Sequence, residues 1–536
     1  MILHRKIRSM PGGAGNYGDY LAKLGEQARE KDGPDLGSYY SKNEAVRGMW
    51  QGELAKKWGI EGKEILPGDK IFAALNDGLD PKGKPLGQRT IKERKPTFTQ
   101  AFTACRRELG RKPTEEEARA KLATMNSEGP IRFYDFTSSV PKALSIAIVT
   151  CNDEALRKLV QDSYKTAVAE ELAKLAARRV RDEGALPDAR ETTGSAICGF
   201  FPHDLSRDGI DPNFHMHACF ANVVETPDGT RYALEAADMA KAKNLADAKA
   251  MSAIAMGAKK LGYELEIEKD ARGNVVRWDI AGISRKARER MSGQHKKIEA
   301  AIAEYERRNG FKPSRKEEDL LQRREAEKMR KNSREVMTPE IRSQQIARLG
   351  DEWRGVTAVV SAAMAKRAKP PRANERRERE EAEKAVASAL RHLEERLQIW
   401  PRHVLESEAL KASFGKAGPL EISRAVDSAL AAEQGAVLVD RRDGEPDLMR
   451  AVSTPGAVRR EFYSLDRIAA NAGTCQPLAK FTPSPKHSAE QNAAVRAICE
   501  TRDRVICVEG AAGTGKTHTM KYARTMLEKA GQEVLV

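Results

Sequence analysis

The chain has 536 residues and carries 93 Lys and Arg against 78 Asp and Glu, a formal net charge of +15. This length is typical of several domains, and the basic surplus excludes an acidic, disordered chain and favours a polyanionic partner such as nucleic acid. The seven cysteines are scattered and show no CxxC spacing, which predicts a reduced, cytoplasmic protein. The sequence shows no apolar signal segment and no apolar run of 18 residues, so we expect no secretory signal and no membrane span.

The first elements expected along the chain are a short strand and a group of tyrosines. Residues 1–10 are predicted to form the strand, which a Gly-rich turn follows. Four of the 11 tyrosines lie within the first 40 residues: Tyr17, Tyr20, Tyr39 and Tyr40. A tyrosine phenolate can attack phosphorus and hold a strand end covalently. The plainer interpretation of each is aromatic packing of an N-terminal helix.

A second strand is predicted over 131–139 (IRFYDFTSS), and an amphipathic helix over 154–183. We expect Asp135 to end that strand, among small polar residues. A carboxylate there could fix the orientation of a metal-binding histidine, whereas an ordinary turn or helix-capping aspartate is the alternative.

The most informative window follows, where two predicted strands (SAICGFFPH and FHMHACFANVVE) flank a turn-rich segment. Alternate residues of a strand face the same side, so His215 and His217 present parallel imidazoles, and His203 can join them from a hairpin partner. Three neutral imidazoles leave coordination positions open, and an ion without a carboxylate ligand keeps the full positive charge that suits a phosphate oxygen. Histidine pairs are commonly core or surface residues, but three of the nine histidines fall in this window.

Most of the positive surplus lies further along, over 281–400, with 30 basic against 20 acidic residues. Strong helix formers and interleaved charges predict helices here, which could be a solvated connector or could contact a nucleic acid backbone. The histidine window itself is not basic, because residues 201–250 hold 5 basic and 8 acidic side chains.

Near the C-terminus, RVICVEGAAGTGKTHTMKYARTML is expected to form a strand, a Gly-rich loop and a helix. The pattern G-x-x-x-x-G-K-S/T is matched by Gly510, Gly513, Gly515, Lys516 and Thr517. In this pattern backbone N–H groups surround phosphates, the lysine reaches the β- and γ-phosphates, and the hydroxyl binds Mg²⁺. ATP with Mg²⁺ is therefore the expected ligand.

Together these segments resemble conjugative relaxases of the TrwC/TraI (MobF) type over about residues 1–360. AGNY, ending at Tyr17, is similar to the first catalytic tyrosine segment of that family, and the pair at 39–40 followed by WQG is similar to the second. DFTSSVPKALS, beginning at Asp135, is similar to the signature D-x-T-x-S-x-P-K-x-x-S. The histidine window completes the match.

Two departures from the family pattern are visible. The family often has adjacent tyrosines first, whereas Tyr17 is followed by Gly-Asp-Tyr20, which leaves open which of the two is the first nucleophile. The interval from His203 to His215 is about one residue longer than is typical, which a bulge or a longer turn could absorb.

The resemblance implies an α/β relaxase domain with a central antiparallel sheet, HUH-type and palm-like, flanked by helices. It also implies transesterification at a plasmid origin of transfer, in which a tyrosine takes the 5′ end as a phosphotyrosine and a 3′-hydroxyl is released, with Tyr39 or Tyr40 serving a second strand transfer. His203, His215 and His217 would hold Mg²⁺ or Mn²⁺, with Zn²⁺ or Ni²⁺ as alternatives. Asp135 would orient a histidine or help to deprotonate the tyrosine, and Lys142 and Arg207 would contact phosphate. Single-stranded origin DNA, and accessory relaxosome and coupling proteins, would be the partners.

SAEQNAAV, which contains Gln491, resembles the adenine-reading segment of superfamily 1 helicases, although an exposed helix residue is the plainer interpretation. In the family a helicase follows the relaxase. Because no Asp/Glu pair follows the loop before Val536, we expect the incomplete start of a RecA-like P-loop domain, with little or no ATPase activity. The expected domains are the relaxase (1–300), a charged helical extension (301–398), a small helicase N-terminal domain (399–480) and the P-loop segment (481–536).

Two other functions fit parts of the sequence. One is an ATP-driven helicase fragment whose N-terminal part is a non-catalytic DNA-binding module. The other is a metal-binding protein that captures DNA without cutting it. Rolling-circle replication initiators also pair histidines, but their tyrosine follows the histidines, whereas here the tyrosines precede them.

Overall fold

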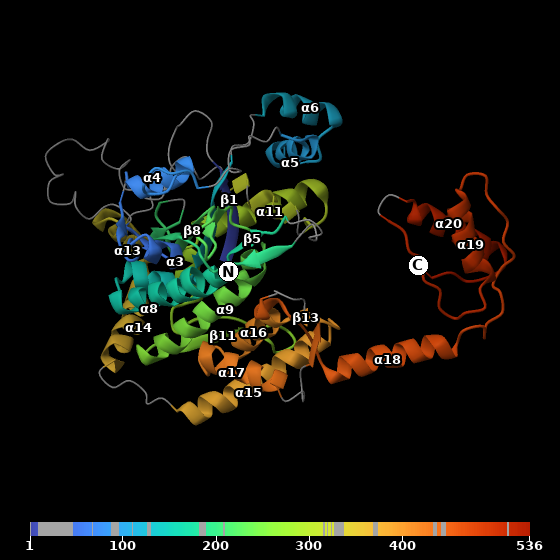
Figure 1. Cartoon of the computed structure of the whole chain (residues 1–536). Coiled ribbons are helices and arrows are strands. Elements are labelled where there is room, and N and C mark those ends of the chain that lie inside the picture. The colour runs from blue at the N-terminus through green and yellow to red at the C-terminus, as the bar shows by residue number, and fades with distance from the viewer. Residues whose placement is uncertain are drawn as a thin grey trace. The chain divides into compact units, whose positions relative to one another are not determined.

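The computed structural model describes residues 2–8, 47–66, 68–86, 96–109, 111–125, 130–181, 189–206, 209–314, 317–318, 320–322, 324–325, 337–367, 374–431, 437–440, 446–511 and 514–535. The chain forms two compact units, Met1–Val452 and Ser453–Val536 (Figure 1). None of the described helices is both long and apolar enough to cross a membrane. This division into two units does not test the four predicted domain ranges, which remain a prediction.

Six strands form the central sheet of the first unit, in the order β1-β4-β8-β7-β2-β3, and every neighbouring pair is antiparallel. This confirms the predicted α/β class with a central antiparallel sheet, and also the strands predicted at 1–10, at 131–139 and around the histidines. Their bounds are β1 (Ile2–Arg8), β2 (Gly48–Gln51), β3 (Glu64–Ile65), β4 (Ile131–Ser139), β7 (Cys198–Leu205) and β8 (Pro212–Ala221).

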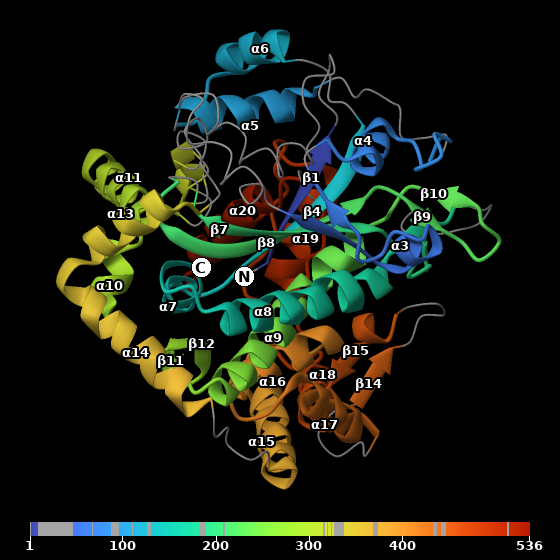
Figure 2. The same ribbon diagram turned by 90° about the vertical axis from the view of Figure 1, so that its left-hand side faces the viewer.

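The two faces of this sheet have different surroundings because side chains alternate along each strand. On one face Phe136, Met216 and Phe220 are buried in the largest core, together with residues of α8 (Glu154–Tyr164) and α9 (Ala237–Lys260). Both helices lie along that side of the sheet (Figure 2). The opposite face carries the histidines at one end of β7 and β8. At the other end it carries a smaller core that includes Trp50, Phe72, Phe133 and Phe201.

The helix predicted over 154–183 is shorter than expected. After α8 the chain continues as a π-helical turn, Lys165–Glu171, and a 3-10 turn, Leu172–Leu175. It then becomes extended in β5 (Ala177–Arg179), which pairs with β6 (Arg190–Thr192). The sequence there is rich in helix formers, but ladder hydrogen bonds and the ion pair of Arg178 with Glu191 at 2.6 Å favour the strand. Tertiary pairing overrides local propensity at this point.

A second core of the first unit packs against α9. It is built by three helices and a three-stranded sheet of order β13-β15-β14, and it includes Leu245 and Ala248 of α9. Lys249 of α9 pairs at 3.1 Å with the buried Glu406. Its elements are β13 (Trp400–Pro401), β14 (Val437–Asp440), β15 (Ala451–Ser453), α15 (Glu375–Glu394), α16 (Arg402–Ala412) and α17 (Pro419–Ala431).

The helices expected in the charged stretch 281–400 are present in its described parts. The remaining elements of the first unit are α3 (Glu53–Lys57), α4 (Lys70–Asp77), α5 (Phe98–Leu109), α6 (Glu115–Thr124), α7 (Lys142–Ser145) with a π-helical turn Ile146–Thr150, β9 (Val224–Glu225), β10 (Arg231–Tyr232), β11 (Leu265–Lys269), β12 (Val275–Ile280), α10 (Arg285–Arg290), α11 (Gly293–Asn309), α13 (Pro339–Leu349), α14 (Trp353–Lys366) and short 3-10 turns at Gly350–Glu352 and Asp447–Met449.

The second unit contains α18 (Pro455–Ala470), α19 (Ala489–Glu500) and α20 (Lys516–Lys529). Val495 and Cys499 of α19 pack against Ala523 and Leu527 of α20. The strand predicted just before the Gly-rich loop is wrong for this structure, because residues 501–511 form no strand. A strand needs a neighbour for its backbone hydrogen bonds, and the described residues 454–535 contain no other strand.

Candidate metal centre

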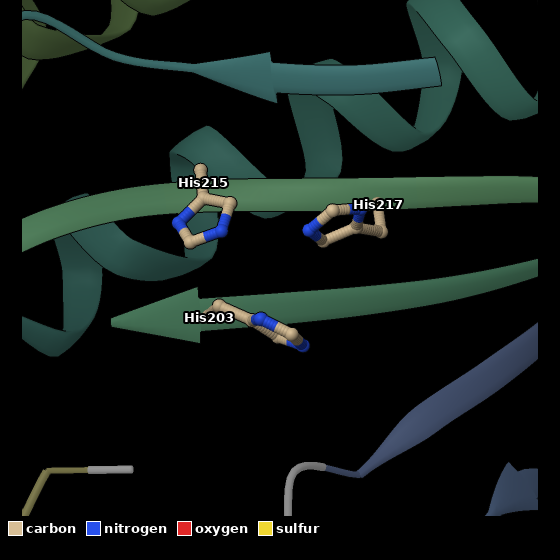
Figure 3. A group of neighbouring side chains, drawn as sticks. All are labelled: His203, His215 and His217. Atoms are coloured by element: carbon tan, nitrogen blue, oxygen red, sulfur yellow. The ribbon is translucent and has the colours of Figure 1, made fainter. Parts of the chain in front are cut away.

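Three histidines meet on one face of the β7–β8 hairpin. His203 of β7 lies directly opposite His215 of β8, and His217 lies two residues further along β8. Their ring centroids are 5.0–5.2 Å apart, and one nitrogen of each lies within 4.8 Å of the others. The imidazoles face one another across the two strands (Figure 3). The antiparallel register therefore produces the three-histidine group that the sequence predicts.

The hydrogen bonds of two of these rings decide which nitrogen can bind a metal. His215 Nδ1 donates to the carbonyl oxygen of Asn213 at 2.7 Å, and His217 Nδ1 donates to the Asp135 carboxylate at 2.9 Å. A carbonyl and a carboxylate only accept, so each ring carries a proton on Nδ1, and Nε2 is the nitrogen left to bind a metal. Both imidazoles are thus oriented and in the tautomer that a metal ligand needs.

Asp135 lies in the middle of β4 rather than at its end, where the sequence had suggested it. It is completely buried, opposite Cys219 of β8 in the ladder. Besides His217, its carboxylate accepts a hydrogen bond from Thr137 Oγ1 at 3.1 Å. The alternative of a turn or helix cap is therefore excluded for this aspartate.

Two cysteines lie near Asp135 but do not enlarge the donor set. Burial, and after it the negative charge of Asp135, raises the pKa of both the Cys198 and the Cys219 thiols well above the usual range. Both side chains therefore stay protonated at neutral pH, whereas a cysteine ligand binds metal as a thiolate. Three imidazoles are the donors that the described residues offer.

The connection between the two ligand strands is held from outside the hairpin. The ladder is irregular between His203 and Leu205, in the interval where the sequence suggested a bulge or a longer turn. Asp211, which is buried, pairs with Arg348 of α13 at 2.5 Å and accepts the backbone N–H of Gly293 at the start of α11.

Gln345, one turn before Arg348 in α13, also contacts the connection between β7 and β8. It is completely buried, donates to the Ile210 carbonyl at 2.6 Å and accepts from Thr150 Oγ1 at 2.7 Å. Helix α13 therefore fixes the end of the hairpin beside the three histidines. Sequence reasoning did not single out Gln345 or Arg348, because nothing local links residue 345 or 348 to residues 210–211.

The segment after β4 supports the first residues of β8. Lys142 Nζ donates to the Pro212 carbonyl at 2.8 Å, and Ser145 Oγ accepts the backbone N–H of Phe214 at 3.1 Å. The N–H groups of Ala143 and Leu144 donate to Asp279 of β12, at 3.0 and 3.1 Å. The lysine and serine of the D-x-T-x-S-x-P-K-x-x-S segment thus hold the strand that carries His215 and His217.

Some predicted site residues cannot be placed. Tyr17, Tyr20, Tyr39 and Tyr40 lie outside the described residues, as do Arg207 and Gly513. The structure therefore brings together His203, His215, His217 and Asp135, with Lys142 bonded to the backbone beside them.

The Gly-rich loop lies in the second unit. Gly515, with φ +80°, precedes α20, which begins at Lys516. Lys516 Nζ donates to the carbonyl oxygens of Gly510 and of Ala511, the latter at 3.0 Å. Gln491 Nε2 donates to the Thr514 carbonyl at 3.0 Å, so α19 contacts the loop directly. Thr517 is the second residue of α20.

Comparison with known proteins gives two family matches. The TrwC relaxase family matches residues 14–349, which is more than half of the chain, and an AAA domain matches residues 486–536. The multifunctional conjugation protein TraI of Escherichia coli strain K12 is 29% identical over 181 residues. That alignment covers 32% of this chain but only 10% of TraI, so the chain spans about a tenth of this relative.

Solved structures of the conjugative relaxase TrwC are also similar. A copper-bound complex with oriT DNA has a TM-score of 0.43 and 22% identity, covering 66% of this chain and 98% of that chain. A complex with a 27-mer DNA comprising the recognition hairpin and the cleavage site has a TM-score of 0.42 and 23% identity, with the same coverage.

Proposed function

The chain belongs to the TrwC relaxase family, and from this premise we propose that it nicks one DNA strand at an origin of transfer and transfers that strand through a covalent tyrosine ester. The single observation that carries the proposal is the group of His203, His215 and His217, with His217 oriented by the buried Asp135. Such a group can bind a divalent ion and leave positions open for a phosphate oxygen.

The donor set fits a divalent metal ion. Two of the three imidazoles have their Nδ1 proton engaged, which places the lone pair on Nε2, and no carboxylate competes for the ion within the described site. Imidazole donors suit Zn²⁺, Ni²⁺ and Cu²⁺ better than Mg²⁺, which prefers oxygen. We therefore place transition metals ahead of Mg²⁺ as the ion held here. When bound, the ion supplies positive charge to the scissile phosphate.

The proposed reaction exchanges one phosphoester for another. The phenolate oxygen of a tyrosine forms a bond to the scissile phosphorus while the bond from phosphorus to the 3′ oxygen breaks. The 3′ oxygen takes up a proton and leaves as a hydroxyl, and the 5′ phosphate stays on the tyrosine. Tyr17 or Tyr20 is proposed as the first nucleophile, with Tyr39 or Tyr40 acting in a second transfer.

The residues of this chain have separate roles in that reaction. Asp135, held by Thr137, keeps His217 in one tautomer and orientation, which supports the positioning role rather than proton removal from tyrosine. The Lys142 ammonium contacts the Pro212 carbonyl, so we assign it first to holding β8. Phosphate contact by Lys142 and by Arg207 stays a proposal.

The second unit is proposed to bind ATP with Mg²⁺ through Gly510, Gly513, Gly515, Lys516 and Thr517, with Gln491 reading the adenine. The match of residues 486–536 to an AAA domain supports this. We propose single-stranded origin DNA as the main partner, accessory relaxosome and coupling proteins as further ones, and the cytoplasm as the place of action.

A covalent adduct is the decisive test. The full chain is incubated with Mn²⁺ or Mg²⁺ and a labelled origin-of-transfer oligonucleotide, and the products are resolved on a denaturing gel and by peptide mass. We expect a protein–DNA adduct on one tyrosine peptide. Complete absence of an adduct with the cognate oligonucleotide would falsify the proposal. An adduct that survives Tyr17→Phe but not Tyr20→Phe would identify Tyr20 as the nucleophile.

A further inference from the structure

Helix α18 in the second unit exposes two adjacent aromatic side chains that no function described above uses. Phe462 and Tyr463 are each 63% exposed, and every residue over 461–470 is exposed. Burying aromatic surface is strongly favourable, so side chains of this size on an exposed helix mark a contact surface for something else.

The two aromatics belong to different faces of the helix. Residues four apart lie above one another, so Arg459, Tyr463 and Arg467 form one row. The guanidinium of Arg467 lies 5.9 Å from the centre of the Tyr463 ring. Within the described part of the chain, neither Arg459 nor Arg467 forms an ion pair with a carboxylate. This row, named here the arginine–tyrosine face, is therefore cationic at both ends and aromatic in the middle.

The other large side chains point away from that row. Phe462, Leu465 and Ile468, exposed by 63%, 55% and 43%, share the opposite side of the helix with Glu461. Asp466 lies at the edge of the arginine–tyrosine face, and Arg460 adds a third positive charge beside it. The helix thus separates an apolar side from a side whose net charge is positive.

We propose that the arginine–tyrosine face of α18 binds single-stranded DNA. Tyr463 stacks on one base, and Arg459 and Arg467, about 12 Å apart along the helix axis, contact phosphates on either side of it. An unpaired base offers its ring face to a side chain, whereas the bases of a duplex are stacked on one another, so a single strand fits this face better than a duplex. The proposal rests on the proposed function only in that nicking provides a single strand for α18 to hold.

The test measures how the full chain binds a fluorescent dT20 oligonucleotide at a series of salt concentrations. Each lost phosphate contact makes the slope of log K against log salt less negative by about 0.7 for single strands. We expect the double variant Arg459→Ala/Arg467→Ala to change the slope by about 1.4. Tyr463→Ala is expected to weaken dT20 binding about tenfold. Tyr463→Phe keeps an aromatic ring and is expected to bind dT20 like the unmodified chain.

Phe462→Ala is the matched control, because it removes an equally exposed aromatic from the same helix but from the other side. It is expected to bind dT20 like the unmodified chain. An unchanged salt slope in the double arginine variant would overturn the proposal, and so would equal losses in Phe462→Ala and Tyr463→Ala. In a second measurement, a bromodeoxyuridine-substituted strand is expected to crosslink to the peptide containing Tyr463, and crosslinking only elsewhere would contradict the proposal.

The experiments distinguish a failure of DNA binding by α18 from a failure of the proposed nicking activity. The α18 variants are expected to form the covalent origin adduct at the normal rate when a short oligonucleotide is used. If the unmodified chain forms no adduct but its dT20 binding depends on Tyr463, the nicking proposal is refuted and the proposal of DNA binding by α18 is supported.

Discussion

The histidine group of the first unit and the Gly-rich loop of the second are built in opposite ways. The histidines come from two paired strands, and their orientation depends on Asp135 in a third strand and on contacts from α13. The loop is one continuous segment before α20, and its lysine donates to carbonyl oxygens of the loop itself. The first site is held by distant parts of the chain, whereas the second is held by its own neighbours and by Gln491 of α19.

This difference predicts which site responds more strongly to single substitutions. A ligand fixed by a sheet and by buried hydrogen bonds is oriented before its metal arrives, so removing a ligand or a side chain bonded directly to one disturbs the site most. A phosphate-binding loop presents backbone N–H groups, which every substitution except one to proline leaves in place. Single substitutions at the two sites test this contrast.

Removing a metal ligand is expected to have the largest effect. His215→Ala should reduce the rate of adduct formation by roughly 10³-fold or more, because the ion contributes several kcal/mol to the transition state. Adduct rate and bound metal, the latter by elemental mass spectrometry, measure this effect, and treatment with EDTA should have the same effect on the unmodified chain. His295→Ala, which removes an exposed histidine paired with Glu299 on α11, is the control. Full metal content in His215→Ala would refute the three-histidine site.

Weakening the support of His217 should have a smaller effect. Asp135→Asn keeps the shape but removes the charge that fixes the imidazole proton, so metal affinity is expected to fall about 10- to 100-fold. Calorimetric titration with Mn²⁺ or Ni²⁺ measures it. Thr137→Val, which removes one hydroxyl hydrogen bond to the same carboxylate and leaves its bond to His217, should lower metal affinity only a few-fold. Equal metal affinity in Asp135→Asn and the unmodified chain would show that Asp135 does not support metal binding.

The nucleotide loop is expected to respond less. Lys516→Ala should lower ATP affinity about tenfold through loss of a charge-assisted hydrogen bond to phosphate. Adduct formation should not change. Fluorescent nucleotide binding measures the first effect, and Lys521→Ala, an exposed lysine within α20, is the control. A strong loss of nicking in Lys516→Ala would contradict the independence of the two sites.

Removing the contact of α13 with the connection between β7 and β8 should have the smallest effect. Arg348→Ala removes the partner of the buried Asp211, which still accepts the Gly293 N–H. Because Arg348 is itself partly exposed, we expect a loss of about 1 kcal/mol in the free energy of unfolding by urea. The absorption spectrum of bound Co²⁺ should shift as well, since the hairpin end would move relative to the histidines. Arg354→Ala on α14 is the control, and an unchanged Co²⁺ spectrum would limit α13 to a purely structural role.

Local patterns in the sequence predicted that the three histidines meet on one hairpin and that a helix follows the Gly-rich loop. The two-residue period of a strand places His215 and His217 on one face, and a hairpin brings His203 opposite, because neither inference needs a distant segment. The Gly-rich loop and its helix are likewise contiguous. The same reasoning failed where the outcome depends on pairing: the helix after residue 154 ends at Leu175, and residues 504–509 form no strand without a partner.

The support of the histidine hairpin comes from contacts between segments that are far apart in sequence. Asp135 meets His217 through the register of β4 with β8, 82 positions apart in sequence. Gln345 and Arg348 reach the hairpin connection from a helix more than 130 positions away. No local propensity encodes such contacts, because they arise when the sheet and its covering helices pack together. The residue pattern thus specifies which histidines share one face of the hairpin, whereas the packed fold sets their orientation and support.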